Sequence, residues 1–271
     1  MTSIPDIEAL KTRLKSMWMA GDYGHFAQYL EPGALRFMDS LGIRSGDRVL
    51  DVACGAGQLT LPIARLGAQV VGVDIASNLV EQARKRAQAA GLEADFEEGD
   101  AEALRFDDAS FDVVFSLIGA MFAPRPERVA AEMMRVCRRT GRLAMGNWTP
   151  AGFIGQMFKI TASHVAPPVG MPSPVLWGDE DSVRQRFGDG VRDLSMTRRM
   201  YSIRYPFAPP AVVEFFRSYY GPTNRAFGAL DEAGQAALRG DLEALWQQHN
   251  AATDGSTAIE AEYLEILATR T

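Results

Sequence analysis

Three aspartates and two glycines of this chain have the types and spacing needed to hold a polar small molecule. Asp51 precedes a turn that contains Gly55 and Gly57, Asp74 ends a second apolar run, and Asp100 follows a third segment. Carboxylates accept hydrogen bonds from hydroxyl, amino and ammonium groups. The glycines have no Cβ, so the backbone there can approach a ligand closely. Because Asp51 would repel a pyrophosphate, this set favours a nucleoside with an amino-acid tail over a phosphate-rich ligand.

The segment around the two glycines predicts a strand, a turn and a helix. Val49, Leu50 and Val52 form an apolar run, and an amphipathic pattern follows the turn. The helix N-terminus offers unpaired N–H groups beside the same spot. A dinucleotide-binding loop would place a third Gly or Ala near Thr60 and Leu61, so a nicotinamide-dependent oxidoreductase is the less favoured alternative.

The other two aspartates fit the same site. Asp74 lies 17 residues after Gly57, close to the spacing at which an acidic residue accepts ribose hydroxyls. Asp100 follows the weak, acidic run 94–99, which we expect at a sheet edge. Asp100 could equally cap the short turn that leads to Leu104.

Strand and helix patterns alternate from about residue 46 to 149. The expected strands are 49–52, 70–74, 94–99, 111–116 and 142–148, and basic residues with glycine at 138–141 predict the end of the helix that begins at Pro126. Such alternation requires a mostly parallel sheet with right-handed crossovers. Further helices are expected at 25–30, 31–41, 153–165, 180–187, 207–220 and 231–249, and around Ile4 to Met17, with β-like runs at 194–206 and 261–269.

Two motifs resemble those of a known family. The sequence Asp51-Val-Ala-Cys-Gly55-Ala-Gly57 resembles the first motif of class I S-adenosylmethionine-dependent methyltransferases, acidic-x-Gly-x-Gly-x-Gly, with Ala53 in place of the first glycine. Phe111-Asp112-Val113-Val114 matches the family pattern Phe-Asp-x-Val. The likeness covers a little over a third of the chain and points to the small-molecule branch of the family (methyltransferase type 11, UbiE-like).

The resemblance implies a fold and a division of the chain. The expected fold is α/β, a Rossmann-like, doubly wound, seven-stranded sheet that is mostly parallel with an antiparallel last strand. Residues 1–45 would form a helical lid, 46–149 the cofactor-binding core, and 150–271 the remaining strands with helical insertions on the acceptor side. The three parts would form one integrated domain.

The resemblance also implies a cofactor and the residues that hold it. S-adenosyl-L-methionine would be the methyl donor and S-adenosyl-L-homocysteine the product. Asp74 would accept from the ribose, Ile75 would pack on the adenine, and Asp100 would accept from the adenine amino group with the Ala101 backbone beside it. The full expected set is Asp51, Ala53, Gly55, Gly57, Asp74, Ile75, Asp100, Ala101 and Ser116, with Trp18 and Tyr23 in the lid. Both lid aromatics could instead only pack that segment onto the core.

Methyl transfer from a sulfonium is an in-line displacement, so alignment of the acceptor and exclusion of water are the main requirements. A base is needed only if the acceptor must lose a proton, and His25 and His164 are the weak candidates for that role. Met and aromatic residues after position 120 indicate a partly apolar acceptor, whose identity and accepting atom stay open. A non-catalytic S-adenosylmethionine-binding protein, or transfer of another group, stays open as well.

Composition narrows the class of protein. The 271 residues carry 28 Lys and Arg against 34 Asp and Glu, a net charge of −6 that disfavours nucleic acid as a partner. Two distant cysteines, Cys54 and Cys137, indicate neither a disulfide framework nor a metal site. No apolar run is long enough to span a bilayer, and no leader pattern begins the chain. We expect a cytoplasmic monomer or homodimer acting on a small molecule.

Overall fold

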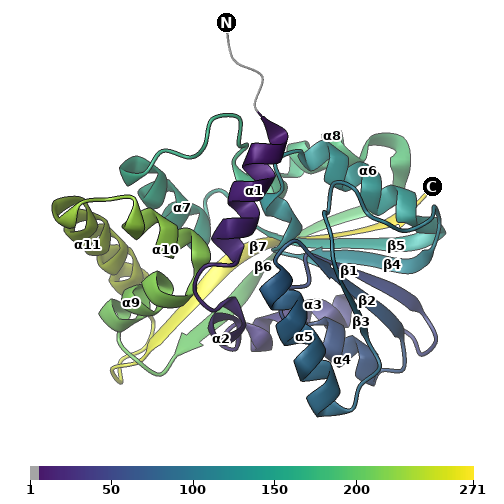
Figure 1. Ribbon diagram of the computed structural model, residues 1–271, viewed down its shortest axis with the longest axis horizontal. Coiled ribbons are helices and arrows are strands. Elements are labelled where there is room, and N and C mark those ends of the chain that lie inside the picture. The colour runs from purple at the N-terminus through teal and green to yellow at the C-terminus, as the bar shows by residue number, and fades with distance from the viewer. Residues whose placement is uncertain (1–5) are drawn as a thin grey trace, which may run out of the picture.

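A seven-stranded sheet forms the centre of the protein in the computed structural model, which describes residues 6–271 (Figure 1). The strand order is β3-β2-β1-β4-β5-β7-β6. The strands are β1 Arg48–Val52, β2 Gln69–Asp74, β3 Asp95–Glu98, β4 Phe111–Leu117, β5 Cys137–Trp148, β6 Val191–Tyr205 and β7 Thr257–Arg270.

Strand direction agrees with the expected fold. β1 to β5 pair in parallel, whereas β7 runs antiparallel to both β5 and β6. The weak acidic strand β3 lies at one edge, as its composition predicts. The Rossmann-like, mostly parallel sheet with an antiparallel last strand is therefore confirmed.

Helices flank the sheet on both faces. α3, α4 and α5 lie on one side and α6 and α8 on the other, while α7, α9, α10 and α11 gather at one end of the molecule (Figure 1). The helices are α1 Ile7–Trp18, α2 Tyr23–Ala27, α3 Glu31–Ser40, α4 Thr60–Arg65, α5 Ser77–Ala90, α6 Pro126–Val136, α7 Phe153–His164, α8 Glu180–Phe187, α9 Pro209–Tyr219, α10 Gly221–Gly228 and α11 Glu232–His249. Short 3-10 turns are η1 Ala120–Phe122, η2 Pro174–Gly178 and η3 Gly188–Gly190.

The first motif forms because its strand is buried and its start is pinned. Val49, Leu50 and Val52 are fully buried in β1. At the beginning of the strand, the backbone N–H of Arg48 donates to Asp112 Oδ2 at 2.7 Å. The aspartate of the Phe-Asp-x-Val pattern thus fixes β4 beside β1, which brings the carboxyl ends of both strands to the same edge.

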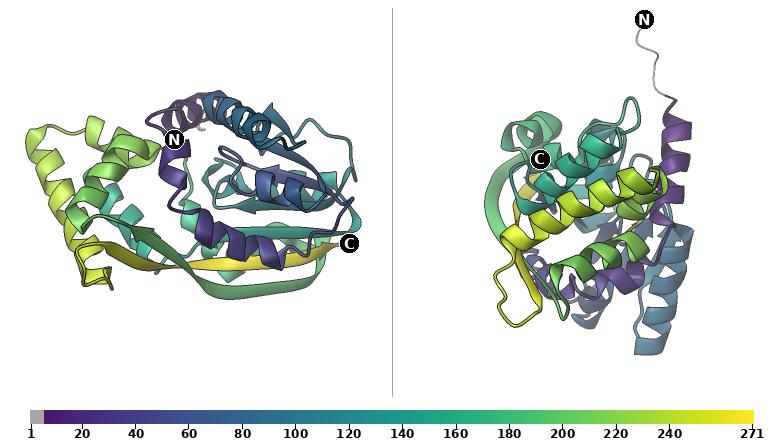
Figure 2. Two further views of the ribbon diagram at one scale, coloured as in Figure 1. Left: turned by 90° about the horizontal axis from the view of Figure 1, so that it is seen from below. Right: turned by 90° about the vertical axis from the view of Figure 1, so that its left-hand side faces the viewer.

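β6 and β7 extend beyond the rest of the sheet. β7 pairs with β5 only over 263–269 and continues with β6 alone down to Thr257. The helices α7, α9, α10 and α11 pack around this extension and form a helical end to the molecule (Figure 2). Trp246 lies at its centre, with its ring centroid 4.6 Å from that of Phe153 and 5.1 Å from that of Phe216.

Local sequence signals account for some helix ends but not for others. Asp179 and Asp231 cap α8 and α11 through their side chains. The predicted helix end at 138–141 is wrong, because Cys137 is already extended and pairs with Phe111. Pairing with β4 overrides the local helix-ending signal, and Thr140 rather than Gly141 takes the positive φ. Ile4 lies outside the described residues.

Candidate active site

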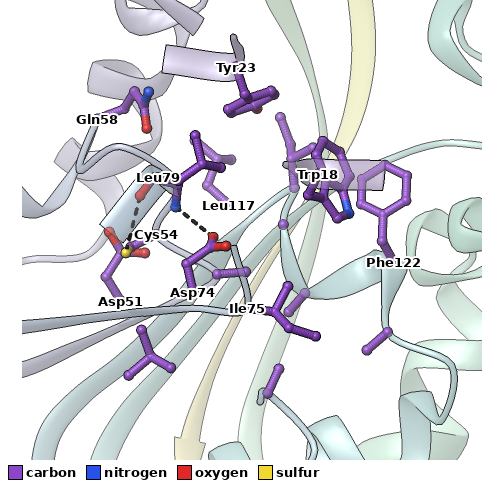
Figure 3. Close-up of a pocket in the computed structure, with 18 of the residues that line it drawn as sticks. Trp18, Tyr23, Asp51, Cys54, Gln58, Asp74, Ile75, Leu79, Leu117 and Phe122 are labelled. Atoms are coloured by element: carbon purple, nitrogen blue, oxygen red, sulfur yellow. Dashed lines mark hydrogen bonds between the residues drawn. The ribbon is translucent and has the colours of Figure 1, made fainter. Parts of the chain in front are cut away.

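A pocket opens at the carboxyl ends of β1, β2 and β4 and is covered by α1 and α2 (Figure 3). It holds about 1100 Å³ of empty space, open solvent at its mouth included. In open α/β sheets ligands bind at this edge of the strands.

Most of the residues expected around a cofactor line this pocket. They are Trp18, Tyr23, Asp51, Ala53, Gly55, Asp74, Ile75, Asp100 and Ala101. Two further residues of the expected set lie behind its wall. Gly57 has φ +79° and packs on Phe96, and the Ser116 hydroxyl is fully buried and accepts the Ala120 N–H at 3.1 Å. Both shape the loops that line the pocket rather than its surface.

Asp74 organises the glycine turn. Its Oδ2 accepts the Gly55 N–H at 2.8 Å (Figure 3). Its Oδ1 accepts the Ala76 N–H, also at 2.8 Å. These bonds leave one lone pair on each carboxylate oxygen available for a ligand. Burial raises the pKa of Asp74, and the backbone hydrogen bonds oppose that rise.

Asp51 is buried beside Asp74. Its Oδ2 accepts the Thr60 hydroxyl at 2.7 Å, which gives the threonine at the expected third-glycine position a structural role. Burial, with a smaller contribution from the charge of Asp74, raises the pKa of Asp51 to about 7, although the Thr60 hydrogen bond opposes the rise. A cationic group placed here would remove the penalty on the ionised form.

The floor between Asp51 and Asp74 is a close backbone approach that fits an amino-acid tail. Ala53 and Gly55 have φ of +60° and +56°, and a Cβ on Gly119 would lie 2.5 Å from that of Ala53. The side-chain amide Nε2 of Gln58 is buried at this pocket without a hydrogen-bond partner. An unpartnered donor and two buried carboxylates suit a ligand that carries both a carboxylate and an ammonium group.

Asp100 marks the other end of the polar half. Its Oδ1 accepts the Glu102 N–H at 2.9 Å, so it does cap its own turn, and its Oδ2 lies 2.5 Å from Lys11 Nζ. It also lines the pocket, with Ala101 and Ile75. The capping role and a ligand-facing role are therefore compatible.

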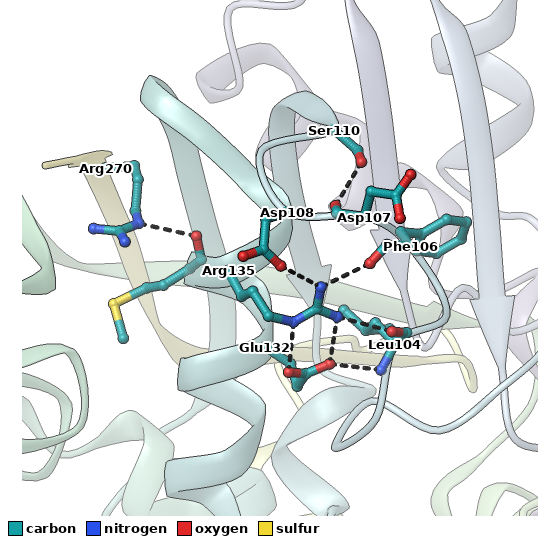
Figure 4. Close-up of polar contacts among 9 residues, drawn as sticks. Leu104, Phe106, Asp107, Asp108, Ser110, Glu132, Arg135 and Arg270 are labelled. Atoms are coloured by element: carbon teal, nitrogen blue, oxygen red, sulfur yellow. Dashed lines mark hydrogen bonds and ion pairs between the residues drawn. The ribbon is translucent and has the colours of Figure 1, made fainter.

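Arg135 of α6 fastens the loop that follows Asp100 (Figure 4). Its guanidinium donates to the carbonyls of Leu104 and Phe106 at 2.8 and 2.7 Å and to the carboxylates of Asp108 and Glu132. Glu132 in turn accepts the Leu104 N–H at 2.8 Å. The hydrogen bonds and charge of Arg135 lower the pKa of Glu132. The loop that carries Asp100 is thus held to a core helix.

The rest of the pocket lining is largely apolar. Leu30, Ala34 and Leu117 belong to it, together with the ring of Tyr201. The Tyr201 hydroxyl donates to the Leu30 carbonyl at 2.5 Å, and the ring lies flat on Gly33, where a Cβ would come within 2.1 Å. Burial raises the pKa of Tyr201 well above its usual value, so this hydroxyl stays protonated.

Trp18, Tyr23 and Phe122 form an aromatic cluster in the pocket lining. The Trp18 ring centroid lies 5.5 Å from that of Tyr23 and 5.0 Å from that of Phe122, both edge-to-face (Figure 3). Burial, with the nearby Asp74, raises the pKa of Tyr23. The lid aromatics both pack on the core and face the pocket.

The two histidines lie away from the pocket lining. His25 is exposed on α2, with its ring 4.7 Å from that of Tyr219, and His164 Nε2 lies 2.7 Å from Asp241 Oδ2. Sequence reasoning missed Lys11 and Gln58, which do line it together with Tyr201.

Comparison with known proteins identifies the family. The family model described as "Methyltransferase domain" matches residues 50–145. An uncharacterised protein of Mycobacterium tuberculosis is 39% identical over 244 residues, which cover 89% of each chain. Through this methyltransferase domain, residues 50–145, the chain belongs to the class I S-adenosylmethionine-dependent methyltransferase family.

Other relatives share the family's core. A demethylmenaquinone methyltransferase of Deinococcus radiodurans is 38% identical over 127 residues, 45% of this chain and 53% of the relative. The crystal structure of the YcgJ protein of Bacillus subtilis has a TM-score of 0.60 at 17% identity, over 88% of this chain and 97% of that one, which shows a shared fold.

The described residues give three further findings. Residues 6–271 contain no cluster of three or more His, Cys, Asp or Glu side chains placed to hold a metal ion. No helix in the same range is long and apolar enough to cross a bilayer. Cys54 and Cys137 are both buried and unbridged.

Proposed function

We propose that this protein transfers the methyl group of S-adenosyl-L-methionine to a small, partly apolar acceptor. One observation supports the proposal: the lining of a single pocket combines the carboxylates Asp51, Asp74 and Asp100 with apolar side chains, and we call these two parts its polar half and its apolar half. The polar half suits the cofactor and the apolar half suits an acceptor. The expected organisation into a lid, a cofactor core and an acceptor side is part of this proposal.

The polar half would hold the cofactor by the groups already described. Asp74 would accept from the ribose hydroxyls, Asp100 would accept from the adenine amino group, and Asp51 would compensate the ammonium of the amino-acid tail. Ile75 would pack on the adenine, and Trp18 and Tyr23 would cover it. Gly57 and Ser116 would act indirectly by shaping the loops that present these groups.

The bound cofactor would supply an activated methyl on a sulfonium, whose carbon an acceptor lone pair can attack in line while the C–S bond breaks and S-adenosylhomocysteine leaves. The chain's own contribution is orientation and exclusion of water. Leu30, Ala34 and Tyr201 would orient the acceptor, and the lid aromatics would exclude water. Neither His25 nor His164 lies at the pocket, which favours an acceptor that brings its own lone pair and needs no histidine base.

Two alternatives are distinct in what they predict. A protein that only binds S-adenosylmethionine would use the same polar half, but it has no need of the open apolar half. A nicotinamide-dependent oxidoreductase would need a loop for pyrophosphate where Asp51 and Thr60 are hydrogen-bonded to each other. The pocket therefore favours methyl transfer over both.

Calorimetric titration with S-adenosylmethionine, S-adenosylhomocysteine and NAD tests the proposal. We expect micromolar binding of the first two and none of NAD. Asp74→Ala should weaken binding by about 1.5–3 kcal/mol for each charge-assisted hydrogen bond lost. Binding of NAD alone would indicate a nicotinamide-dependent oxidoreductase instead of a methyltransferase. If the cofactor binds, an acceptor screen that yields no methylated product from a wide set of apolar nucleophiles would favour a binding protein.

A further inference from the structure

One stripe of α1 faces the pocket and changes from charged to aromatic along the helix. Lys11, Leu14 and Trp18 recur at helical spacing, and all three line the pocket. Trp18 reaches the middle of the pocket, and Lys11 lies at the Asp100 end. The lid helix therefore meets the polar half through one ammonium group and one indole.

The ammonium of Lys11 bridges two carboxylates of the loop after β3. Its Nζ lies 2.5 Å from Asp100 Oδ2 and 2.9 Å from Glu102 Oε2, and its side chain is only 11% exposed. Burial lowers the pKa of Lys11, but hydrogen bonds and charge from the two carboxylates outweigh it, so the pKa is raised. The group is charged at neutral pH.

Glu102 connects three parts of the pocket wall. Its side chain is fully buried, and its Oε1 and Oε2 accept from the Arg125 backbone N–H at 2.6 Å and from Arg125 Nε at 2.7 Å. Arg125 follows Ala123 and Pro124, which line the pocket. One carboxylate thus joins α1, the Asp100 loop and the segment before α6. Buried ion pairs of this kind are costly to break from one side, because the remaining charge is left uncompensated.

The C-terminal end of α1 is held in a different way. Arg225 of α10 donates to the Ser16 carbonyl at 3.2 Å and to its hydroxyl at 3.1 Å. Gly221 packs so closely that a Cβ would lie 2.1 Å from the Met17 carbonyl. This end is anchored by packing against α10, whereas Lys11 ties the helix to the Asp100 loop by charge. A second ion pair, Lys15 with Glu98, lies on the solvent side.

We infer that Lys11 is a positioning residue that locks α1 over the polar half of the pocket through Asp100 and Glu102. The inference rests on the proposed function, because Asp100 is the carboxylate assigned to the adenine. A ligand that leaves beneath α1 must first part Lys11 from both carboxylates. The lock therefore sets the rate at which the demethylated cofactor product, S-adenosylhomocysteine, is released.

Stopped-flow tryptophan fluorescence on the full chain measures this release, because Trp18 lines the pocket. We expect Lys11→Met to raise the dissociation rate of S-adenosylhomocysteine about tenfold and to change the association rate by less than about threefold. Lys11→Arg keeps the charge and should stay within about threefold of the wild type. Lys85→Met is the matched control, since Lys85 is 72% exposed on α5 and should leave both rates unchanged.

A second variant keeps the test independent of Lys11 itself. Glu102→Gln removes one charge of the lock without touching Asp100 and should also accelerate release. A dissociation rate for Lys11→Met within about twofold of the wild type overturns the inference. An acceleration that Lys11→Arg shares overturns it too, because that variant retains the cation. Failure of the wild type to bind S-adenosylhomocysteine overturns the proposed function instead.

Discussion

At the scale of single residues, the pocket holds two groups in states that they do not prefer. Asp51 is a buried carboxyl beside another carboxyl, and burial is the main reason that its pKa rises to about 7. Ile118, a β-branched residue, has φ +68°, and the Gly119 N–H donates to the Leu117 carbonyl across it at 2.8 Å, which closes a strained γ-turn. Strain of this kind concentrates at ligand sites, and both residues line the pocket.

The raised pKa of Asp51 predicts pH-dependent cofactor affinity. Below about pH 7 the free protein carries a proton on Asp51, which a ligand ammonium must displace. We expect affinity for S-adenosylhomocysteine to rise about tenfold between pH 6 and pH 8. Asp51→Asn should bind more weakly at pH 8 and show little change with pH. Calorimetry at pH 6, 7 and 8 gives both profiles, and parallel profiles would contradict the prediction.

The same variant has a linked effect on stability that serves as its control. Because the folded-state pKa lies above the unfolded value of about 4, the free wild type loses stability as the pH rises from about 4 to about 7. Asp51→Asn lacks this loss. Its free energy of unfolding relative to the wild type should therefore be higher at pH 8 than at pH 5.

The strained turn at Ile118 should matter for ligand affinity, whereas an equally strained residue away from the pocket should affect only stability. Ile118→Gly relieves the strained φ but removes an apolar side chain and frees the turn, so affinity for S-adenosylhomocysteine should fall about three- to tenfold. Thr140 is the matched control, since it is also β-branched with φ +63°, is exposed, and lies away from the pocket. Thr140→Gly should gain up to about 1 kcal/mol in stability with unchanged affinity. Equal affinity in Ile118→Gly and the wild type would show that the turn serves only the fold.

At the scale of elements, close approaches between helices and strands set the shape of the apolar half. α3 lies against β6 because Gly33 leaves room for the Tyr201 ring, which in turn bonds to the Leu30 carbonyl. The position of the ring in the pocket therefore depends on the absence of a side chain on a helix 168 residues earlier in the chain.

Two glycine-to-alanine changes should have opposite effects on stability. Alanine gains about 1 kcal/mol over glycine inside a helix. At Gly33 a Cβ would lie 2.1 Å from Tyr201, and overpacking of about 1–3 kcal/mol exceeds that gain, so Gly33→Ala should destabilise. Gly240 in α11 has no atom within 4 Å of such a Cβ, and Gly240→Ala should stabilise by about 0.5–1 kcal/mol. Urea unfolding of both measures the two signs, and stabilisation by Gly33→Ala would mean that the ring moves freely.

At the scale of the whole molecule, local sequence signals predict the strands of the core but not all of the secondary structure at the periphery. The strands β1, β2 and β4 follow from apolar runs and turns, because their residues are largely buried. β6 has no clean alternation, since half of it is an exposed edge and its other end lies under helices. The helix α10 goes unpredicted because it follows α9 with only Tyr220 between them.

The same contrast applies to the pocket. Asp51, Asp74 and Asp100 are predictable because strand ends of a parallel sheet meet at one edge. Lys11 and Tyr201 are not, since their partners lie 89 and 171 residues away in sequence. Spacing within one element carries no information about such distant pairs.

The long antiparallel pairing of β6 with β7 also determines which part of the molecule can move. β6 and β7 stay paired from the sheet to the region packed against α9 and α11. The helical end is therefore joined to the core by a continuous two-stranded ladder and not by a flexible linker. Swinging that end outward would require the ladder between the strands to break. Among residues 6–271, access to the pocket is therefore expected to depend on movement of the N-terminal helices α1 and α2 and not on movement of the helical end.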